Sequence, residues 1–136
     1  MEQQLRAMIQ AGLTDLHPAR INWGEHPADM AGAYIVLHLV GQTEGHTQQG
    51  PDGLEQARVQ VDCYAPTYGQ ANGMGRAVKS LLNGYRSGGF RGIFFDQMRQ
   101  AREDGDNSVN NAGRAAEAVF RASLDFIIHW RNENAG

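Results

Sequence analysis

Residues 50–95 read GPDGLEQARVQVDCYAPTYGQANGMGRAVKSLLNGYRSGGFRGIFF, and this stretch decides the fold. Its segment Arg58–Tyr64 alternates polar and apolar side chains, which is the period of a strand with one buried face. Val59, Val61 and Cys63 are therefore predicted to face a core, and the residues between them to lie on the opposite face of the sheet.

A helix is predicted directly after this strand. Pro66 interrupts the strand, and Thr67 is of the residue type that caps a helix N-terminus. The small Ala71 and Gly75 are expected to pack closely against strands, because each interior glycine costs a helix about 1 kcal/mol relative to alanine. Apolar or small residues then recur at helical spacing: Ala71, Met74, Gly75, Val78, Leu81, Leu82 and Tyr85.

Length, composition and charge limit the class of protein. The 136 residues fit a single domain spanning 1–136, and 41% hydrophobic with 20% charged residues is typical of a globular protein. The net charge of -3 argues against a domain that grips nucleic-acid phosphates, while DNA could pass such a surface without adhering. A single cysteine excludes an internal disulfide, and no apolar run approaches membrane-spanning length. We therefore expect a cytoplasmic chain without membrane association.

The N-terminal half supplies a further helix and strand. Apolar spacing predicts an amphipathic helix over Gln3–Leu16, and Arg20–Trp23 is either a short strand or an extended link. The segment Ala33–Val40 is apolar on both faces, which suits a strand covered on both sides or one whose second face meets another subunit. The polar, glycine-rich stretch Gln42–Gly53 is predicted to be a loop, with the tip of a long hairpin as the alternative.

The C-terminal half completes the sheet. Gly92–Met98 and Phe120–Arg131 are predicted strands, and Gln100–Glu117 between them is predicted to be a long loop. The fold class is α+β: a mainly antiparallel four-stranded sheet with two helices packed on one face and long polar loops. Exposed edges of such a sheet favour assembly. The polar alternate residues are expected to face water or a neighbour: Arg58, Gln60, Asp62, Arg121, Ser123, Asp125 and Arg131.

The sequence gives no positive sign of catalysis. A nucleophile reading would combine Cys63 with one of the five histidines, but the alternation places Cys63 on the inward face, where cysteine behaves as a small hydrophobic residue. The histidines form no pair at metal-ligand spacing, and the acidic stretch 103–106 falls short of a calcium loop. We expect no enzyme activity, no cofactor and no metal, with a small cysteine-dependent enzyme as the less favoured alternative.

Three stretches together resemble the small tail-completion, or tail-terminator, proteins of long-tailed bacteriophages and of the gene transfer agents derived from them. The most specific is Ala57–Ala65, followed by the helix entry Thr67-Tyr68. The other two are Ala33–Leu37 and Ser123–Phe126 with Trp130. Their order covers nearly the whole chain, while the glycine-rich second helix and the long segment after Gln100 depart from the usual pattern of the family.

This resemblance implies a structural virion protein that caps the head-proximal end of the tail tube. It implies an α+β subunit in a homo-oligomeric ring, usually a hexamer, which ends tube polymerisation and helps join tail to head. The partners would be the tail tube protein and a head-connector protein, with DNA passing through the ring without specific binding. Before the virion is complete, assembly would take place in the cytoplasm of the host or producer cell. A head-tail connector or another tail-ring component is the alternative within the same class.

Two polar segments are the candidate contacts with the ring neighbours, the tube or the connector. Gln42–Gly53 and Gln100–Glu117 are suited to becoming ordered against a partner on assembly. Within the second, the acidic residues are expected near the channel or the tube. The candidate interface residues are Glu44, His46, Asp52, Arg102, Glu103, Asp104, Asp106 and Arg114.

Overall fold

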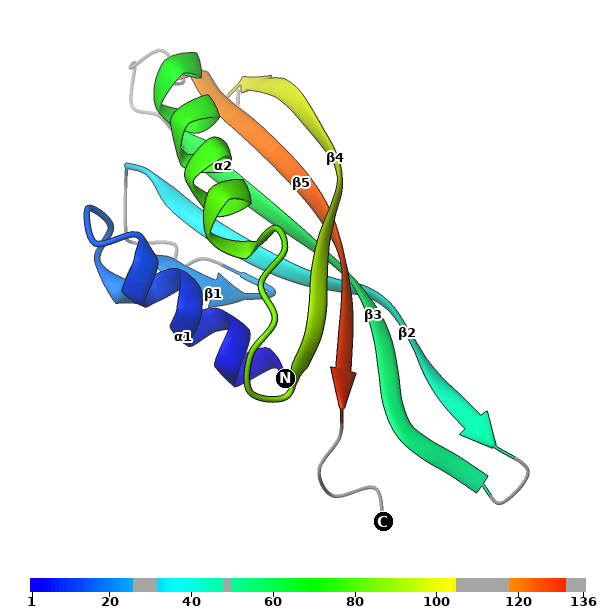
Figure 1. Cartoon of the computed structure of the whole chain (residues 1–136). Helices are drawn as coiled ribbons and strands as arrows, with labels where there is room; N and C mark the ends of the chain where they lie inside the picture. Colours follow the sequence, from blue (N-terminus) through cyan, green and yellow to red (C-terminus); the bar gives the residue numbers. More distant parts are fainter. Residues whose placement is uncertain (26–31, 48–49, 105–117, 132–136) are drawn as a thin grey trace.

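The computed structural model describes residues 1–25, 32–47, 50–104 and 118–131. Two helices lie on one face of a long, strongly twisted sheet (Figure 1). In chain order the elements are α1 (Glu2–Gly12), a short 3-10 helix (Pro18–Arg20), β1 (Ile21–Trp23), β2 (Tyr34–Thr47), β3 (Gly50–Ala65), α2 (Tyr68–Leu82), β4 (Phe90–Asp104) and β5 (Ala118–Arg131).

The sheet has five strands in the order β1-β2-β3-β5-β4. The α+β class is confirmed, but the expected four-stranded sheet lacks one strand. The additional strand is β1, which runs parallel to β2 with Ile21 opposite Ile35 and Trp23 opposite Leu37. Its three residues are too short to show a periodic pattern, so sequence alone could not separate this strand from an extended link. All other pairings are antiparallel.

The core lies between the sheet and the two helices. Val59, Val61 and Cys63 are fully buried, which confirms the predicted inward face of β3. The neighbouring strand β5 adds apolar side chains to the same face of the sheet: Phe126 lies opposite Val59, and Leu124 lies opposite Val61. The helices close this layer with their buried residues Leu5, Ile9, Ala71, Val78 and Leu82.

Both helices end earlier than their apolar patterns suggest. In α2 the predicted cap is confirmed, since the Gln70 backbone N–H donates to the Thr67 hydroxyl at 3.2 Å. The helix then ends at Leu82, and Gly84 follows with a φ of 83°, a left-handed conformation that favours glycine. The helix α1 ends at Gly12 rather than at Leu16. Glycine is a poor helix former, and Leu13 directly after it has left the helical conformation.

The described parts of the two predicted loops are strand. The polar stretch 42–53 continues the β2–β3 ladder, with Gln42 opposite Ala57 and Thr47 opposite Gly50, so the hairpin alternative is correct. Similarly, β4 continues to Asp104, which lies opposite Ala118. These extensions are held by backbone pairing and carry no apolar alternation, which is why the pattern missed them. The rest of the second predicted loop, 105–117, lies outside the described residues.

Gly75 lies where α2 packs closely on the sheet. A Cβ at this position would lie 2.9 Å from Met98 Cε and 3.2 Å from both Ala122 Cβ and Leu124 Cδ1, whereas a Cβ at Gly73 would meet nothing within 4 Å. The expected close packing is thus confirmed.

Two alanine variants in the same helix should therefore have opposite effects. Gly73→Ala is expected to raise the free energy of unfolding by about 0.5–1 kcal/mol through helix propensity. Gly75→Ala gains the same stabilisation from helix propensity, but overpacking against the sheet costs about 1–3 kcal/mol. The free energy of unfolding is therefore expected to fall. Urea denaturation of both variants measures the difference; a Gly75→Ala protein as stable as Gly73→Ala would contradict this packing.

Candidate functional site

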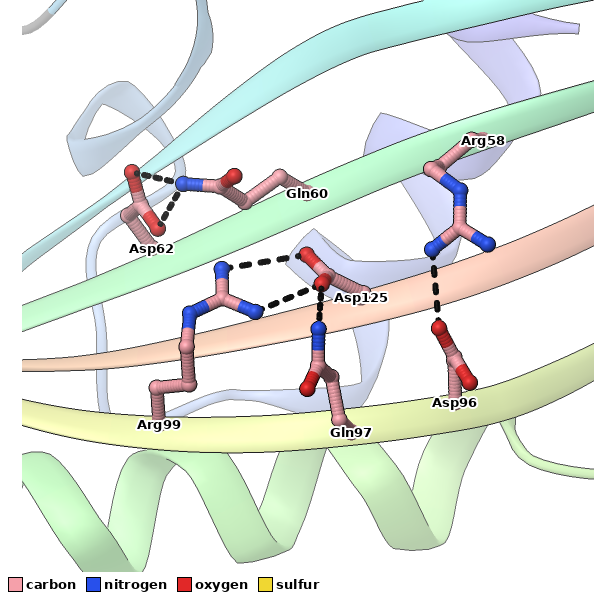
Figure 2. A network of polar contacts seen from close by, with 7 residues as sticks. All are labelled: Arg58, Gln60, Asp62, Asp96, Gln97, Arg99 and Asp125. Atoms are coloured by element: carbon pink, nitrogen blue, oxygen red, sulfur yellow. Dashed lines mark hydrogen bonds and ion pairs between the residues drawn. The ribbon is translucent and has the colours of Figure 1, made fainter.

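The helix-free face of the sheet carries a network of charged and amide side chains (Figure 2). We call this the polar face; the network residues on it are Arg58, Gln60, Asp62, Asp96, Gln97, Arg99 and Asp125. The predicted face of the β3 and β5 polar residues is correct. The prediction that all of them face water or a neighbour is wrong for Asp62, Ser123 and Asp125, which are buried within the chain.

Asp125 is the centre of the network. The Arg99 guanidinium donates Nη1 to Oδ2 at 2.7 Å and Nη2 to Oδ1 at 3.4 Å, and Gln97 Nε2 donates to Oδ2 at 2.9 Å. These hydrogen bonds, led by that of Arg99, lower the pKa of Asp125 below its ordinary value, although burial opposes them. The carboxylate is therefore charged and fully engaged at neutral pH.

A β-bulge places the second ion pair. The register of β4 shifts between Phe95 and Gln97, so Asp96 is the extra residue. Its Oδ2 lies 2.8 Å from Arg58 Nη1, a pair that joins β4 to β3 across the intervening β5. Sequence reasoning missed Asp96, Gln97 and Arg99, because a bulge breaks the period-two pattern. The adjacent polar pair Asp96-Gln97 within an otherwise alternating strand was the available signal.

Asp62 is held from two sides. Gln60 Nε2 donates to both of its carboxylate oxygens, at 2.8 and 3.1 Å, and His38 Nε2 lies 3.3 Å from Oδ2. Next to it, the rings of Tyr34 and Tyr64 stack with centroids 4.7 Å apart. Asp62, Asp96 and Asp125 thus all accept hydrogen bonds from side chains of the polar face. This suits a rigid contact surface rather than a substrate site.

Acid should weaken the fold through Asp125. The pKa of this carboxyl is lower in the folded state than in the unfolded state, where it is near 3.9. The charged carboxylate therefore stabilises the fold fully at a pH above the unfolded-state pKa, and this stabilisation is lost as the pH falls through the folded-state pKa. Asp125→Asn is expected to cost about 1–2 kcal/mol at pH 7. The difference in Tm between the two proteins should shrink from pH 6 to pH 2; a constant difference would show that the charge of Asp125 does not matter.

The cysteine-based alternative finds no support in the described part of the chain. Cys63 has no exposed surface, and burial raises the pKa of its thiol, so it stays protonated. Among the described residues, no three His, Cys, Asp or Glu side chains lie close enough together to hold a metal ion. None of the described helices is long and apolar enough to cross a membrane.

The candidate interface residues separate into two groups. Glu44, His46 and Asp52 lie at the free end of the β2–β3 hairpin. Arg102, Glu103 and Asp104 lie at the other end of the sheet, where the Arg102 guanidinium is 5.9 Å from the Phe120 ring centroid. Leu54 pairs with Arg131 near the first end and Ala65 with Phe120 near the second, so about 11 strand residues, or ~36 Å, separate the two ends. Asp106 and Arg114 lie outside the described residues.

Each edge of the sheet is covered over only part of its length. β1 pairs with β2 at Ile35–Leu37, and beyond this point Leu39–Thr47 pairs with β3 alone. On the other side, the turn after α2 covers the start of β4: Gly84 N–H donates to the Ile93 carbonyl at 2.7 Å and Ile93 N–H to that of Tyr85 at 3.1 Å. Within the described chain, Gln97–Asp104 pairs only with β5. We call Leu39–Thr47 and Gln97–Asp104 the open segments of β2 and β4.

A comparison with family models identifies this architecture. The model of the family "Tail completion protein gp17" matches residues 3–128. The chain belongs to this tail completion family. The resemblance to this family is therefore confirmed, and membership makes the chain a structural protein of the phage tail.

The fold of this tail completion protein also occurs in a solved structure. A chain of the structure titled "Virion of native gene transfer agent (GTA) particle" is 20% identical and superposes with a TM-score of 0.56, covering 96% of this chain and 91% of that chain. This likeness shows a shared fold over nearly the full length of both chains. No curated protein matches this tail completion protein.

Proposed function

We propose that this protein is a virion component that caps the head-proximal end of the tail tube as a ring, ends tube polymerisation and helps join the tail to the head. The observation that carries the proposal is membership of the tail completion family over residues 3–128. The shared fold with a chain of a gene transfer agent virion supports it, because that chain also belongs to a particle. The function needs neither a cofactor nor a catalytic residue.

The open segments support ring formation. They lie at opposite edges of the sheet and differ in sequence, Leu39–Thr47 on β2 and Gln97–Asp104 on β4. Unpaired strand edges are templates for another chain. Contact between two different surfaces of identical subunits is heterologous, and it closes into a ring when the rotation between neighbours permits. A hexamer is the proposed ring size, as the resemblance implies.

The two ends of the sheet suit a subunit that bridges two partners. The hairpin end carries Glu44, His46 and Asp52, and the opposite end carries Arg102, Glu103 and Asp104, about 36 Å away. We propose that one end contacts the tail tube protein and the other the head-connector protein. DNA would pass through the ring without specific binding, because the arginines Arg58 and Arg99 are held by Asp96 and Asp125 instead of being free for phosphates.

A tube-assembly experiment tests this function. Purified tail tube subunits polymerise with and without the protein, and electron microscopy gives the length distribution. We expect tube length to become bounded as the ratio of protein to tube subunit rises, with added tube subunits no longer extending the capped end. If tubes lengthen unchanged at saturating protein while it binds purified connector protein, the alternative of a head-tail connector replaces the terminator function.

Charge reversal at the β4 end tests the proposed contacts. The triple variant Glu103→Lys, Asp104→Lys and Asp106→Lys is expected to leave Tm almost unchanged, because we propose that these charges serve contacts with a partner and not the fold of the subunit. Tail length or head joining should be altered. Glu44→Lys with Asp52→Lys makes the matched change at the hairpin end. If both variants assemble normally, these acidic residues have another purpose.

A further inference from the structure

The open segment of β4 borders a basic groove. The groove, about 600 Å³, runs between α2 and β4 and is lined by Asn72, Arg76, Lys79, Ser80, Asn83, Phe95 and Met98. Its two charged residues are cations, and Phe95 and Met98 form an apolar floor. The Lys79 ammonium lies 4.4 Å from the Phe95 ring centroid. An extended segment bound there would meet positive charge, apolar surface and the unpaired edge of β4.

The open segment of β2 has the complementary composition. It reads Leu-Val-Gly-Gln-Thr-Glu-Gly-His-Thr from residue 39 to 47, and its one formally charged residue is Glu44. Leu39 is 41% exposed and Val40 is 55% exposed, so the strand presents apolar side chains where it leaves the cover of β1. Only four large hydrophobic residues in the described chain are exposed to this extent, and two of them are in this segment.

Strand direction permits the two segments to pair between copies. β2 is antiparallel to β3, β3 to β5, and β5 to β4, so β2 and β4 run in opposite directions within one sheet. The β2 strand of a second copy placed beside β4 would therefore continue the antiparallel alternation. The lengths also match, nine residues in the β2 segment and eight in the β4 segment. The covers near the starts of the two strands, β1 and the turn after α2, leave both segments accessible.

From these observations we propose that Leu39–Thr47 of one copy adds as an antiparallel strand to Gln97–Asp104 of the next, beside the groove formed by Arg76 and Lys79. This inference rests on the proposed ring and names its subunit interface. Backbone hydrogen bonds along the edge give affinity, while charge and apolar complementarity select the β2 segment over another strand. The interface is heterologous, so each copy uses one segment as donor and the other as acceptor.

Photo-crosslinking on capped tubes tests the interface. A benzophenone side chain replaces Ser80, an exposed residue of the groove, in a mixture of isotopically light and heavy protein, and mass spectrometry maps the linked peptides. We expect mixed-isotope links to residues 39–47. The matched control replaces Gly73, which faces open space elsewhere on α2 and should give no such link.

The outcomes separate the interface from the proposed function. Links from position 80 to tube or connector protein, to another segment of a second copy, or to nothing on tubes that are visibly capped would overturn the strand pairing and leave the capping function intact. Tubes that remain uncapped would overturn the capping function and the interface together.

A charge-reversal pair provides the second measurement. Arg76→Glu with Lys79→Glu should raise the protein concentration needed for capping at least tenfold, whereas Arg86→Glu with Arg91→Glu, which reverses two exposed cations that do not line the groove, should leave it unchanged. Equal effects of the two pairs would contradict a role for the basic groove. Unchanged Tm values confirm that each variant is folded.

Discussion

Replacing Phe126 with alanine is expected to lower the free energy of unfolding by about 3–5 kcal/mol. Phe126 is fully buried in the middle of the sheet, opposite Val59 on one side and Phe95 on the other, and its ring meets that of Phe95 edge to face at 5.9 Å. No neighbouring strand can collapse into the space that the ring leaves, because each is fixed by its own ladder. Urea denaturation at a constant m-value measures the loss.

Phe94 provides the control for this variant within the same sheet. Its ring is 50% exposed on the polar face and contacts the His129 ring edge to face at 5.7 Å. Phe94→Ala is therefore expected to cost less than about 1 kcal/mol. If Phe94→Ala destabilised the protein as much as Phe126→Ala, the core would not lie on the helix side of the sheet.

The thiol of Cys63 is expected to react with a thiol reagent on the order of 10³ times more slowly in the native protein than in the unfolded one. The side chain has no exposed surface and lies on β3 between Ile35 of β2 and Ala122 of β5, so modification requires opening of the sheet. A free energy of unfolding of about 5 kcal/mol means that only about one molecule in several thousand is unfolded at any time, which slows the reaction by a factor of this order.

Stopped-flow labelling with and without denaturant measures this protection. Ser80→Cys in a Cys63→Ala background places a thiol on the exposed surface of α2 and should react at the unfolded rate. Native Cys63 that reacts as fast as this control, with loss of an activity, would restore the cysteine-dependent enzyme.

Sequence reasoning succeeded where one face of an element is buried against a uniform core. The alternation around Val59, Val61 and Cys63 fixed β3, and the Thr67 cap fixed the start of α2, because each is a local consequence of burial or backbone bonding. The most specific stretch of the family resemblance, Ala57–Ala65 with Thr67-Tyr68, includes these same residues. The prediction of Cys63 as a core residue followed from the alternation alone.

The remaining features depend on contacts between distant parts of the chain. β1 is a strand only because Ile35–Leu37 lies beside it, and the polar ends of β2 and β3 are strands only because each pairs with the other. The two buried aspartates contact partners on other strands. Asp62 contacts His38 of β2, and Asp125 contacts Arg99 of β4. The basic groove likewise exists only once α2 has packed beside β4.

The candidate interface residues show the same limit. The sequence placed Glu44 and Glu103 in two predicted loops without giving their positions relative to each other. The topology places the two residues at opposite ends of the sheet. Composition could indicate that these segments are solvated. The distance between them follows only from the register of the strands, which the composition does not give. This distance is the reason for proposing one partner at each end of the sheet.

Electron microscopy of tail tubes assembled with the protein, which carries a bound label at its N-terminus, tests whether the protein caps the tube. We expect a ring of labelled subunits at one end of each tube, the end that joins the head, and no label along the tube wall. Label distributed along the tubes, or tubes whose two ends both remain bare at saturating protein, would contradict this capping function.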